Sequence, residues 1–328
     1  MQQSQEMREP RSILIVKPGS LGDVVHTLPA VARVRRRWPQ ARLAWLANPE
    51  WAPILAGNPD VDEVIEFPRQ RFSGLAGWTR LPGWIRALRA RVQPDMVLDF
   101  QGLLRSAVIA RGAGGESWGT SDSREGARLL HHHVVPVPPR SEPFHAVKRY
   151  LALVEAIGCP AGGPLEWRIP EGTPPAGTPT QFILLHPFSR GHGKSLTEVE
   201  VTSFCRDLAP IPVVIAGRGN WSISPLTNTT NLLNRTNLPE LCWLVRHAIF
   251  VASVDSGPMH IAAAVTSNLL AIHTLTDPRK VGPFRPEAFV WREGRLGRMS
   301  DFPGGERCDR SELGRQVVDL LRRQSRIA

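Results

Sequence analysis

One acidic side chain stands in a glycine-containing turn near the start of the chain. The stretch KPGSLGDVVHTLPA (17–30) places Asp23 beside Gly19 and Gly22, after an apolar run (13–16) and before a helix-like segment. Glycines allow a ligand to approach the backbone closely. A carboxylate near a helix N-terminus is stabilised by about 0.3–1 kcal/mol. Asp23 can therefore cap the helix or take a proton from a substrate, and the residues alone leave both roles open.

The same turn does not fit the common nucleotide fingerprints. It lacks the GxGxxG spacing of dinucleotide sites, and no Lys-Ser/Thr pair of a P-loop follows it. An acid at the centre of the turn would repel an anion. A neutral hydroxyl group is therefore the expected guest at Asp23.

The second half of the chain contains a turn of the opposite character. HPFSRGHGKS (186–195) offers Ser189 and Lys194 in a glycine-containing loop, and VDSGPMH (254–260) ends a strand and begins a helix at Gly257. A cationic loop beside free backbone N–H groups suits a diphosphate. A solvated loop lysine is an equally good interpretation of Lys194.

Other candidate side chains have ordinary structural explanations. His260 is better interpreted as a packed helix histidine than as a ligand. The cysteines lack CxxC spacing, so buried thiols are expected rather than a metal site or a disulfide. They are Cys159, Cys205, Cys242 and Cys308.

Composition limits the class of protein. The 328 residues are 42% hydrophobic and 21% charged, as in globular proteins, and are enough for two domains at roughly 150 residues each. Residues 1–12 lack an apolar signal core and no long apolar run is present, so a cytoplasmic location is expected. The net charge of +10 favours an anionic partner or reflects an arginine-rich composition. The arginines are dispersed and no nucleic-acid motif is found, so nucleic acid is not expected as a partner.

Short apolar runs alternate with helix-like stretches in both halves, which predicts two α/β domains with doubly wound, mostly parallel sheets. The expected strands are 13–16, 42–47, 62–67, 95–100, 134–138, 182–188, 211–217 and 250–256. The expected helices are 28–38, 49–57, 82–92, 103–112, 144–158, 197–209, 238–248, 258–265 and 311–326. Thr197 and Glu200 have the spacing of a capping box, which fixes the start of one helix.

The predicted organisation has two Rossmann-like domains that face a central ligand cleft at the carboxyl ends of their strands. The expected bounds are 1–160 for an acceptor-binding domain, 161–180 for a Pro/Gly-rich linker, 181–310 for a nucleotide-sugar-binding domain and 311–328 for a C-terminal helix.

Four motifs in order along the chain resemble the ADP-heptose:lipopolysaccharide heptosyltransferases of glycosyltransferase family 9. They are KPGSLGDVVHTLPA (17–30), DFQGLLRSA (99–107), VDSGPMHIAAAV (254–265) and LTDPRKVGPF (275–284). The resemblance implies the GT-B architecture, an inverting reaction and no metal or other cofactor. GESWGTSDSREGARLL (115–130) resembles the acceptor-side segment of the type I enzymes, which add the first heptose to Kdo. A type II enzyme, or another nucleotide-sugar transferase of the family, is the alternative.

The resemblance also implies roles for individual residues. Asp23 matches the catalytic base of the family. The implied donor-binding residues are Ser189, Lys194, Thr236, Asp255, Ser256 and Gly257. The implied acceptor-binding residues are Gly22, Arg69, Arg71 and Arg124, although a solvated-loop interpretation of Arg69 and Arg71 is nearly as good. The implied partners are ADP-heptose and a lipid A–Kdo acceptor.

Two departures from the family pattern stand out. The usual ribose-binding acid is missing from RGNWSIS (218–224), so either Asn220 replaces it or the nucleotide is held differently. Ser195 and Leu196 replace a Trp-Pro pair after Lys194.

The segment 71–92 mixes tryptophans with arginines and could rest transiently on the cytoplasmic face of an anionic inner membrane, although a core-facing helix with a wet arginine face is the preferred interpretation. Two functions of other classes also remain open: a nicotinamide-dependent oxidoreductase, and a non-catalytic sugar-nucleotide-binding protein.

Overall fold

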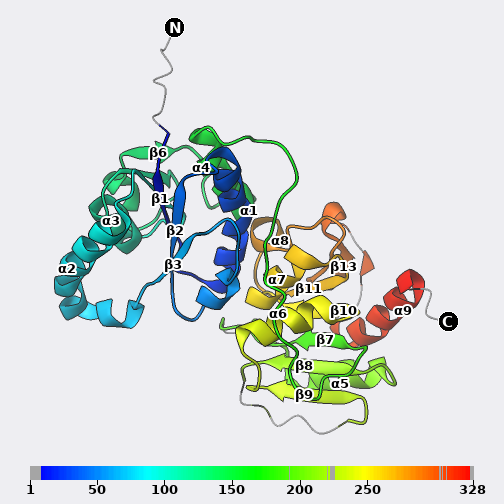
Figure 1. The fold of residues 1–328 in the computed structure, drawn as a ribbon. Helices are drawn as coiled ribbons and strands as arrows, with labels where there is room; N and C mark the ends of the chain where they lie inside the picture. Colours follow the sequence, from blue (N-terminus) through cyan, green and yellow to red (C-terminus); the bar gives the residue numbers. More distant parts are fainter. Residues whose placement is uncertain are drawn as a thin grey trace. The chain divides into compact units, whose positions relative to one another are not determined.

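The chain divides into two compact units, Met1–Arg168 and Ile169–Ala328, and the division falls inside the Pro/Gly-rich stretch 161–180 (Figure 1). The computed structural model describes residues 9–191, 193–219, 221, 226–302, 304, 306–307 and 309–325. Each unit is built around its own sheet.

The sheet of the first unit is entirely parallel in the described residues and has the strand order β3-β2-β1-β4-β5-β6. Its strands are β1 (Ser12–Val16), β2 (Arg42–Ala47), β3 (Glu63–Glu66), β4 (Met96–Asp99), β5 (Glu116–Thr120) and β6 (His133–Val135). This is the order of a doubly wound, dinucleotide-type fold, in which the chain reverses direction across the sheet between its first and fourth strands.

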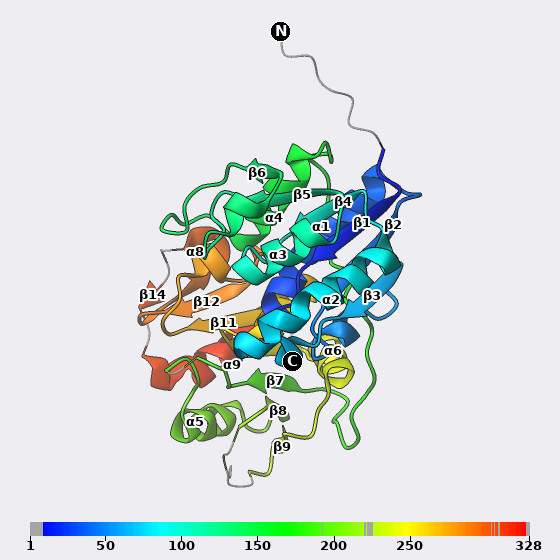
Figure 2. The ribbon, with the colours of Figure 1, turned by 90° about the vertical axis from the view of Figure 1, so that its left-hand side faces the viewer.

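Helices cover both faces of this sheet (Figures 1 and 2). They are α1 (Leu21–Arg37), α2 (Gly74–Val92), α3 (Leu104–Gly112) and α4 (Ala146–Ala156). Helix α1 packs against α4, and α2 packs against α3. Leu14 and Val16 share a buried cluster with Leu81, Ile85 and Leu88 of α2. Because side chains alternate along a strand, Ile13 and Ile15 belong to the other face.

The sheet of the second unit repeats this order and extends it. Across the described residues the order is β14-β13-β12-β11-β10-β7-β8-β9, parallel from β9 to β12 and antiparallel for β13 and β14. The parallel strands are β7 (Ile183–His186), β8 (Val213–Gly217), β9 (Thr229–Leu233), β10 (Phe250–Val254), β11 (Leu269–His273) and β12 (Phe289–Arg292). The added strands are β13 (Arg295–Arg298) and β14 (Glu306–Arg307).

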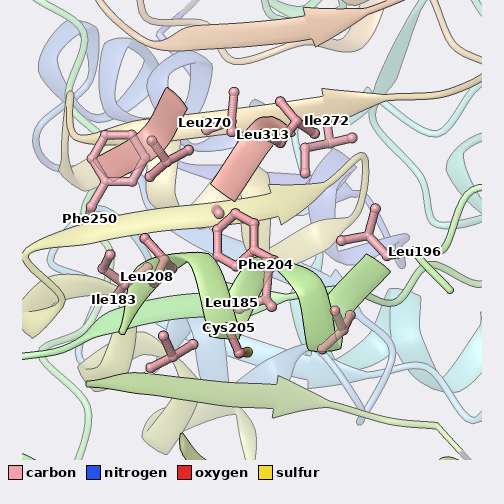
Figure 3. Close-up of a cluster of buried hydrophobic side chains, with 14 of the residues drawn as sticks. Ile183, Leu185, Leu196, Phe204, Cys205, Leu208, Phe250, Leu270, Ile272 and Leu313 are labelled. Atoms are coloured by element: carbon pink, nitrogen blue, oxygen red, sulfur yellow. The ribbon is translucent and has the colours of Figure 1, made fainter. Parts of the chain in front are cut away.

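One face of this sheet carries a large apolar core, part of which is drawn in Figure 3. The helices of the unit are α5 (Glu198–Leu208), α6 (Leu238–His247), α7 (Gly257–Val265), α8 (Pro278–Val281) and α9 (Leu313–Ser325). Phe204 and Leu208 of α5 and Leu313 of α9 pack on Ile183 and Phe250 of the central strands. Helices α6 and α7 pack together, as α5 and α9 do.

The prediction of two doubly wound α/β domains is confirmed. Three local predictions were wrong. Helix α2 begins at Gly74 rather than 82, so Pro82 lies inside it. Helix α1 begins at Leu21 rather than 28 and runs through Pro29, because the turn after β1 is only a few residues long and Ser20 already starts the helix. The segment 49–57 contains a short 3-10 helix, Ala52–Leu55, instead of an α-helix. Strands β5, β9 and β11–β14 were not expected, because their apolar runs are short or interrupted by polar residues.

None of the helices in the described residues combines the length and the apolar character that a membrane span requires.

The capping box at the start of α5 provides a stability test. The Thr197 hydroxyl accepts a hydrogen bond from the Glu200 N–H (3.2 Å), and the Glu200 carboxylate accepts one from the Thr197 N–H (2.7 Å). Thr197→Ala is expected to lower the free energy of unfolding by about 1 kcal/mol in urea titrations. The matched control is Thr202→Ala within the same helix, where alanine is the better helix former and a change within about 0.5 kcal/mol is expected. Equal effects of the two variants would contradict the capping role.

Candidate functional site

Several candidate residues lie at the carboxyl ends of the two central strands of each sheet. In the first unit, Asp23 follows β1 and Asp99 ends β4. In the second unit, Ser189 follows β7 and Asp255 follows β10. The paired strands, β1 with β4 and β7 with β10, are those at which the winding reverses. In doubly wound sheets, ligands bind outside the carboxyl ends of the strands at this switch point.

One carboxylate oxygen of Asp23 serves the helix start. Its Oδ2 accepts hydrogen bonds from the backbone N–H of Ser20 (3.1 Å) and from the Ser20 hydroxyl (2.9 Å). Asp23 is therefore the acidic half of a capping interaction in the first turn of α1. Its side chain is nevertheless 39% exposed, so the carboxylate is accessible to a ligand.

The other oxygen of Asp23 faces a buried lysine and a tyrosine. Asp23 Oδ1 accepts a hydrogen bond from the Tyr150 hydroxyl (3.3 Å) and lies 3.8 Å from Lys17 Nζ. Lys17 Nζ also donates to the Phe100 carbonyl oxygen and to the Tyr150 oxygen, both at 2.9 Å. Burial lowers the pKa of Lys17, and the charges of Asp23 and Asp99 act in the opposite direction. Hydrogen bonds from such donors favour the ionised form of a carboxylate, which is the form that can accept a proton.

Two arginines, Arg124 and Arg140, add positive charge near Lys17 and Asp23. The backbone N–H of Arg124 donates to the Gly102 carbonyl oxygen (2.8 Å), so the turn after β5 packs on the turn after β4. The charges of Arg124 and Arg140 both act to lower the pKa of Lys17. Both guanidinium groups therefore contribute positive potential near the carboxyl ends of β1 and β4.

The remaining acceptor candidates lie in different settings. Gly22 is buried in the first turn of α1, next to Asp23. Arg69 and Arg71 are exposed on a 3-10 helix, Arg69–Phe72, that follows β3.

The second unit brings together three of the predicted donor residues. Lys194 Nζ lies 2.7 Å from Asp255 Oδ2 in an ion pair, and the Ser189 hydroxyl donates to the Asp255 carbonyl oxygen (3.0 Å). Thr276, which the sequence did not single out, donates to the same Asp255 Oδ2 (2.6 Å). The lysine is 25% exposed and the aspartate only 8%, so the cation is the group offered to a ligand.

Two buried histidines, His260 and His273, lie close enough to the Lys194–Asp255 ion pair to affect the pKa of Asp255. Burial disfavours the Asp255 carboxylate, but His260, His273 and the hydrogen bonds from Lys194 and Thr276 together hold its pKa below the usual value. Burial lowers the pKa of His273 to about 4, and its ring contacts the Thr276 hydroxyl (3.0 Å). Asp255 is therefore an ionised carboxylate with both a cation and a hydroxyl on one oxygen.

Backbone donors lie beside the ion pair. Ser256 is the N-cap of α7 and Gly257 is its first residue. Pro258 has no N–H, so the backbone donors that this helix end offers to an anion are those of Ser256 and Gly257. The Ser256 hydroxyl also contacts the His186 ring (3.3 Å). Thr236 lies in the turn between β9 and α6, directly before the Asn237 N-cap.

The structure explains one of the two sequence departures. Ser195, in place of the family tryptophan, accepts a hydrogen bond from the Ser189 N–H (3.0 Å), and Leu196 is buried in the core. The pair thus holds the loop that carries Ser189 and Lys194. Asn220 lies outside the described residues.

Sequence reasoning missed Lys17, Tyr150, Thr276, His186 and His273. Lys17, Thr276 and His186 lie inside the stretches 17–30, 275–284 and 186–195 already quoted for their turns, so the signal was present but not assigned. Tyr150 reaches Asp23 from α4, 127 positions further along the chain. Within the described residues, no group of three or more His, Cys, Asp or Glu side chains is arranged to hold a metal ion.

The known proteins that resemble this chain are heptosyltransferases. Residues 220–308 match the family described as glycosyltransferase family 9 (heptosyltransferase). Lipopolysaccharide heptosyltransferase 1 of Pseudomonas aeruginosa is 28% identical, with 95% of this chain and 92% of that protein covered. Lipopolysaccharide core heptosyltransferase OpsX of Haemophilus influenzae is 25% identical, with 84% and 82% covered.

Solved structures give the same result for the fold. The structure of E. coli ADP-heptose LPS heptosyltransferase II aligns with a TM-score of 0.73 at 21% identity, covering 94% of this chain and 97% of that one. E. coli heptosyltransferase WaaC with ADP-2-deoxy-2-fluoro heptose aligns with a TM-score of 0.72 at 22% identity, covering 95% and 99%. The expected two-domain α/β fold of the GT-B type is confirmed.

The buried histidines predict a pH-dependent stability. Burial lowers the pKa values of His186 and His273 to about 4 from 6.5. As the pH falls below about 6.5, the unfolded chain binds protons that the folded chain does not, so the free energy of unfolding decreases by roughly 2 kcal/mol per histidine between pH 7 and 5. Urea titrations should show His186→Asn losing less stability than the parent over this interval. An identical loss would contradict the assignment.

Proposed function

We propose that the chain is a sugar-transferring enzyme of glycosyltransferase family 9 and that it moves heptose from ADP-heptose to the inner core of lipopolysaccharide. The curated relatives that cover most of the chain are named as lipopolysaccharide heptosyltransferases, and two of the aligned WaaC structures contain ADP or an ADP-heptose analogue. We assign the transfer to the first heptose, with Kdo as the acceptor sugar.

The donor is assigned to the second unit. A pyrophosphate needs cations and N–H donors, and the partly exposed Lys194 and the N-terminal end of α7 at Ser256 and Gly257 supply both kinds of group. As ADP leaves, negative charge grows on its β-phosphate, and fixed positive groups stabilise that charge most in the transition state. Asp255 orients Lys194 through their ion pair, and Thr236 is assigned to the adenine.

The acceptor and the base are assigned to the first unit. A sugar hydroxyl is a weak nucleophile, and Asp23 takes its proton as the oxygen attacks the anomeric carbon. The new C–O bond forms on the face opposite the departing ADP, so the anomeric configuration inverts. The single observation that carries this assignment is the geometry of Asp23: a partly exposed carboxylate, held by donors on both oxygens, at the switch point of its sheet.

The positive charge of the first unit suits an anionic acceptor. Arg124 and Arg140 lie near the Asp23 group, and the exposed Arg69 and Arg71 follow β3. Carboxylate and phosphate groups of a lipid A–Kdo acceptor are natural partners for arginine. Such an acceptor is anchored in the cytoplasmic face of the inner membrane, and the exposed Trp78 and the exposed arginines of α2 provide a surface for transient contact there.

The direct test is a transfer assay with purified protein, ADP-heptose and Kdo-bearing lipid A in the presence of EDTA. Heptosylated lipid is the expected product, and its formation in EDTA would establish a metal-independent reaction. Binding of ADP-heptose without product would move the acceptor to another sugar. Absence of both product and ADP binding would overturn the proposal.

Asp23→Asn is expected to lower kcat by about 10²–10⁴-fold, because the amide cannot accept the proton, while the dissociation constant for ADP-heptose changes little. Calorimetric donor binding together with initial rates measures both quantities. Undiminished transfer by this variant would contradict the base assignment.

Lys194→Ala should instead weaken ADP-heptose binding and also lower kcat, because it removes a cation that acts on the bound donor and on the developing charge. The matched control is Lys148→Ala, which removes an exposed lysine of α4 in the other unit. Calorimetry and initial rates apply again. Equal donor affinity in the two variants would argue against a phosphate contact for Lys194.

A further inference from the structure

Tyr150 is the only tyrosine of the chain, and it lies against the proposed base. It belongs to α4, which packs on α1, the helix that carries Asp23. Its ring meets the Phe100 ring edge-on, with centroids 5.5 Å apart at 87°. The side chain is partly buried, so this ring contact fixes where the hydroxyl points.

The hydrogen bonds around Tyr150 run in one direction. An ammonium group can only donate, so the Tyr150 oxygen accepts from Lys17 Nζ (2.9 Å). The hydroxyl proton is then directed to Asp23 Oδ1 (3.3 Å). Lys17 itself is anchored by its bond to the Phe100 carbonyl oxygen (2.9 Å). The result is an ordered chain from Lys17 through Tyr150 to Asp23.

This chain completes the restraint on the Asp23 carboxylate. Ser20 holds Oδ2 from the start of α1, and Tyr150 holds Oδ1 from α4. A carboxylate held at only one oxygen can rotate about its last side-chain torsion, whereas one held at both is fixed in plane and direction. A general base works best when its lone pair is aimed before the substrate arrives.

We propose that Tyr150 is a positioning residue that aims the Asp23 carboxylate at the acceptor hydroxyl through its own O–H. This inference rests on the proposed role of Asp23 as the base. Tyr150 does not exchange a proton with the substrate; it fixes the plane of the carboxylate.

A single tyrosine makes the contact measurable without any activity assay. Burial and the neighbouring Asp23 raise the pKa of Tyr150 well above 10, and the charged groups that face it are Lys17, Asp23, Asp122 and Arg140. Tyrosinate absorbance against pH, with Tyr150→Phe as a tyrosine-free blank, reports its ionisation alone. Asp23→Asn removes a negative charge, so Tyr150 should ionise at lower pH than in the parent. Identical curves for the two folded proteins would overturn the proposal.

Kinetics supply the second arm of the test. Tyr150→Phe removes only the hydroxyl and keeps the ring contact with Phe100. It should lower kcat roughly tenfold, the factor that one hydrogen bond to a charged group can supply, and leave KM for ADP-heptose unchanged. Lys148→Ala, on the exposed side of the same helix, should behave as the parent. Parent-like rates for Tyr150→Phe with a loss only in Tyr150→Ala would assign the effect to ring packing and overturn the proposal.

The two arms separate this inference from the function on which it rests. If Asp23→Asn still transfers heptose, the base assignment fails whatever the absorbance shows. If Asp23→Asn is inactive but the tyrosinate curve does not move, the base assignment stands and only the role of Tyr150 fails.

Discussion

The reversal of winding in each sheet is the constraint on which the rest of the molecule depends. Both sheets build outward from a first strand, β1 or β7, and then return to place β4 or β10 on its other side. The helices that follow these paired strands cover opposite faces, which leaves the carboxyl ends of the pair uncovered. Asp23 and Asp255 follow the ends of these strands, and helix α4 brings Tyr150 to Asp23. The order of the strands therefore determines where the polar side chains of the candidate sites lie.

The two switch points use the same kind of ion pair in opposite senses. At Lys17–Asp23 the lysine is 3% exposed and the aspartate 39%, so the carboxylate is presented. At Lys194–Asp255 the aspartate is 8% exposed and the lysine 25%, so the cation is presented. In each pair the buried partner orients the other, at a desolvation cost offset by its own hydrogen bonds. One unit thus presents a carboxylate and the other a cation, as the proton acceptor and the phosphate partner of the proposed sugar transfer require.

The sequence was informative where the signal is local. Alternating apolar runs and helix-like stretches predicted the two doubly wound domains, and the Thr197 capping box marked the start of α5. Glycine-containing turns pointed to Asp23, Ser189 and Lys194 as candidates, and the family resemblance added Asp255. What escaped prediction depends on long-range packing: Tyr150 reaches Asp23 only because α4 packs on α1, and strands such as β5 (ESWGT) form because a neighbouring strand pairs with them, not because their own residues favour a strand. Those partners are distant in the chain and leave no period or spacing to detect.

The two roles first considered for Asp23 turn out to be compatible, because a carboxylate has two oxygens and each has several acceptor positions. Oδ2 closes the first turn of α1 by accepting from Ser20, and this bond also fixes where the side chain lies. Oδ1 is turned toward Lys17 and Tyr150, which stabilise the ionised form without covering the group from solvent. Capping is therefore compatible with the proposed role of Asp23 as a base. A carboxylate free to adopt other rotamers would need to be ordered at each encounter with a substrate, whereas one built into a helix start is ordered by folding itself.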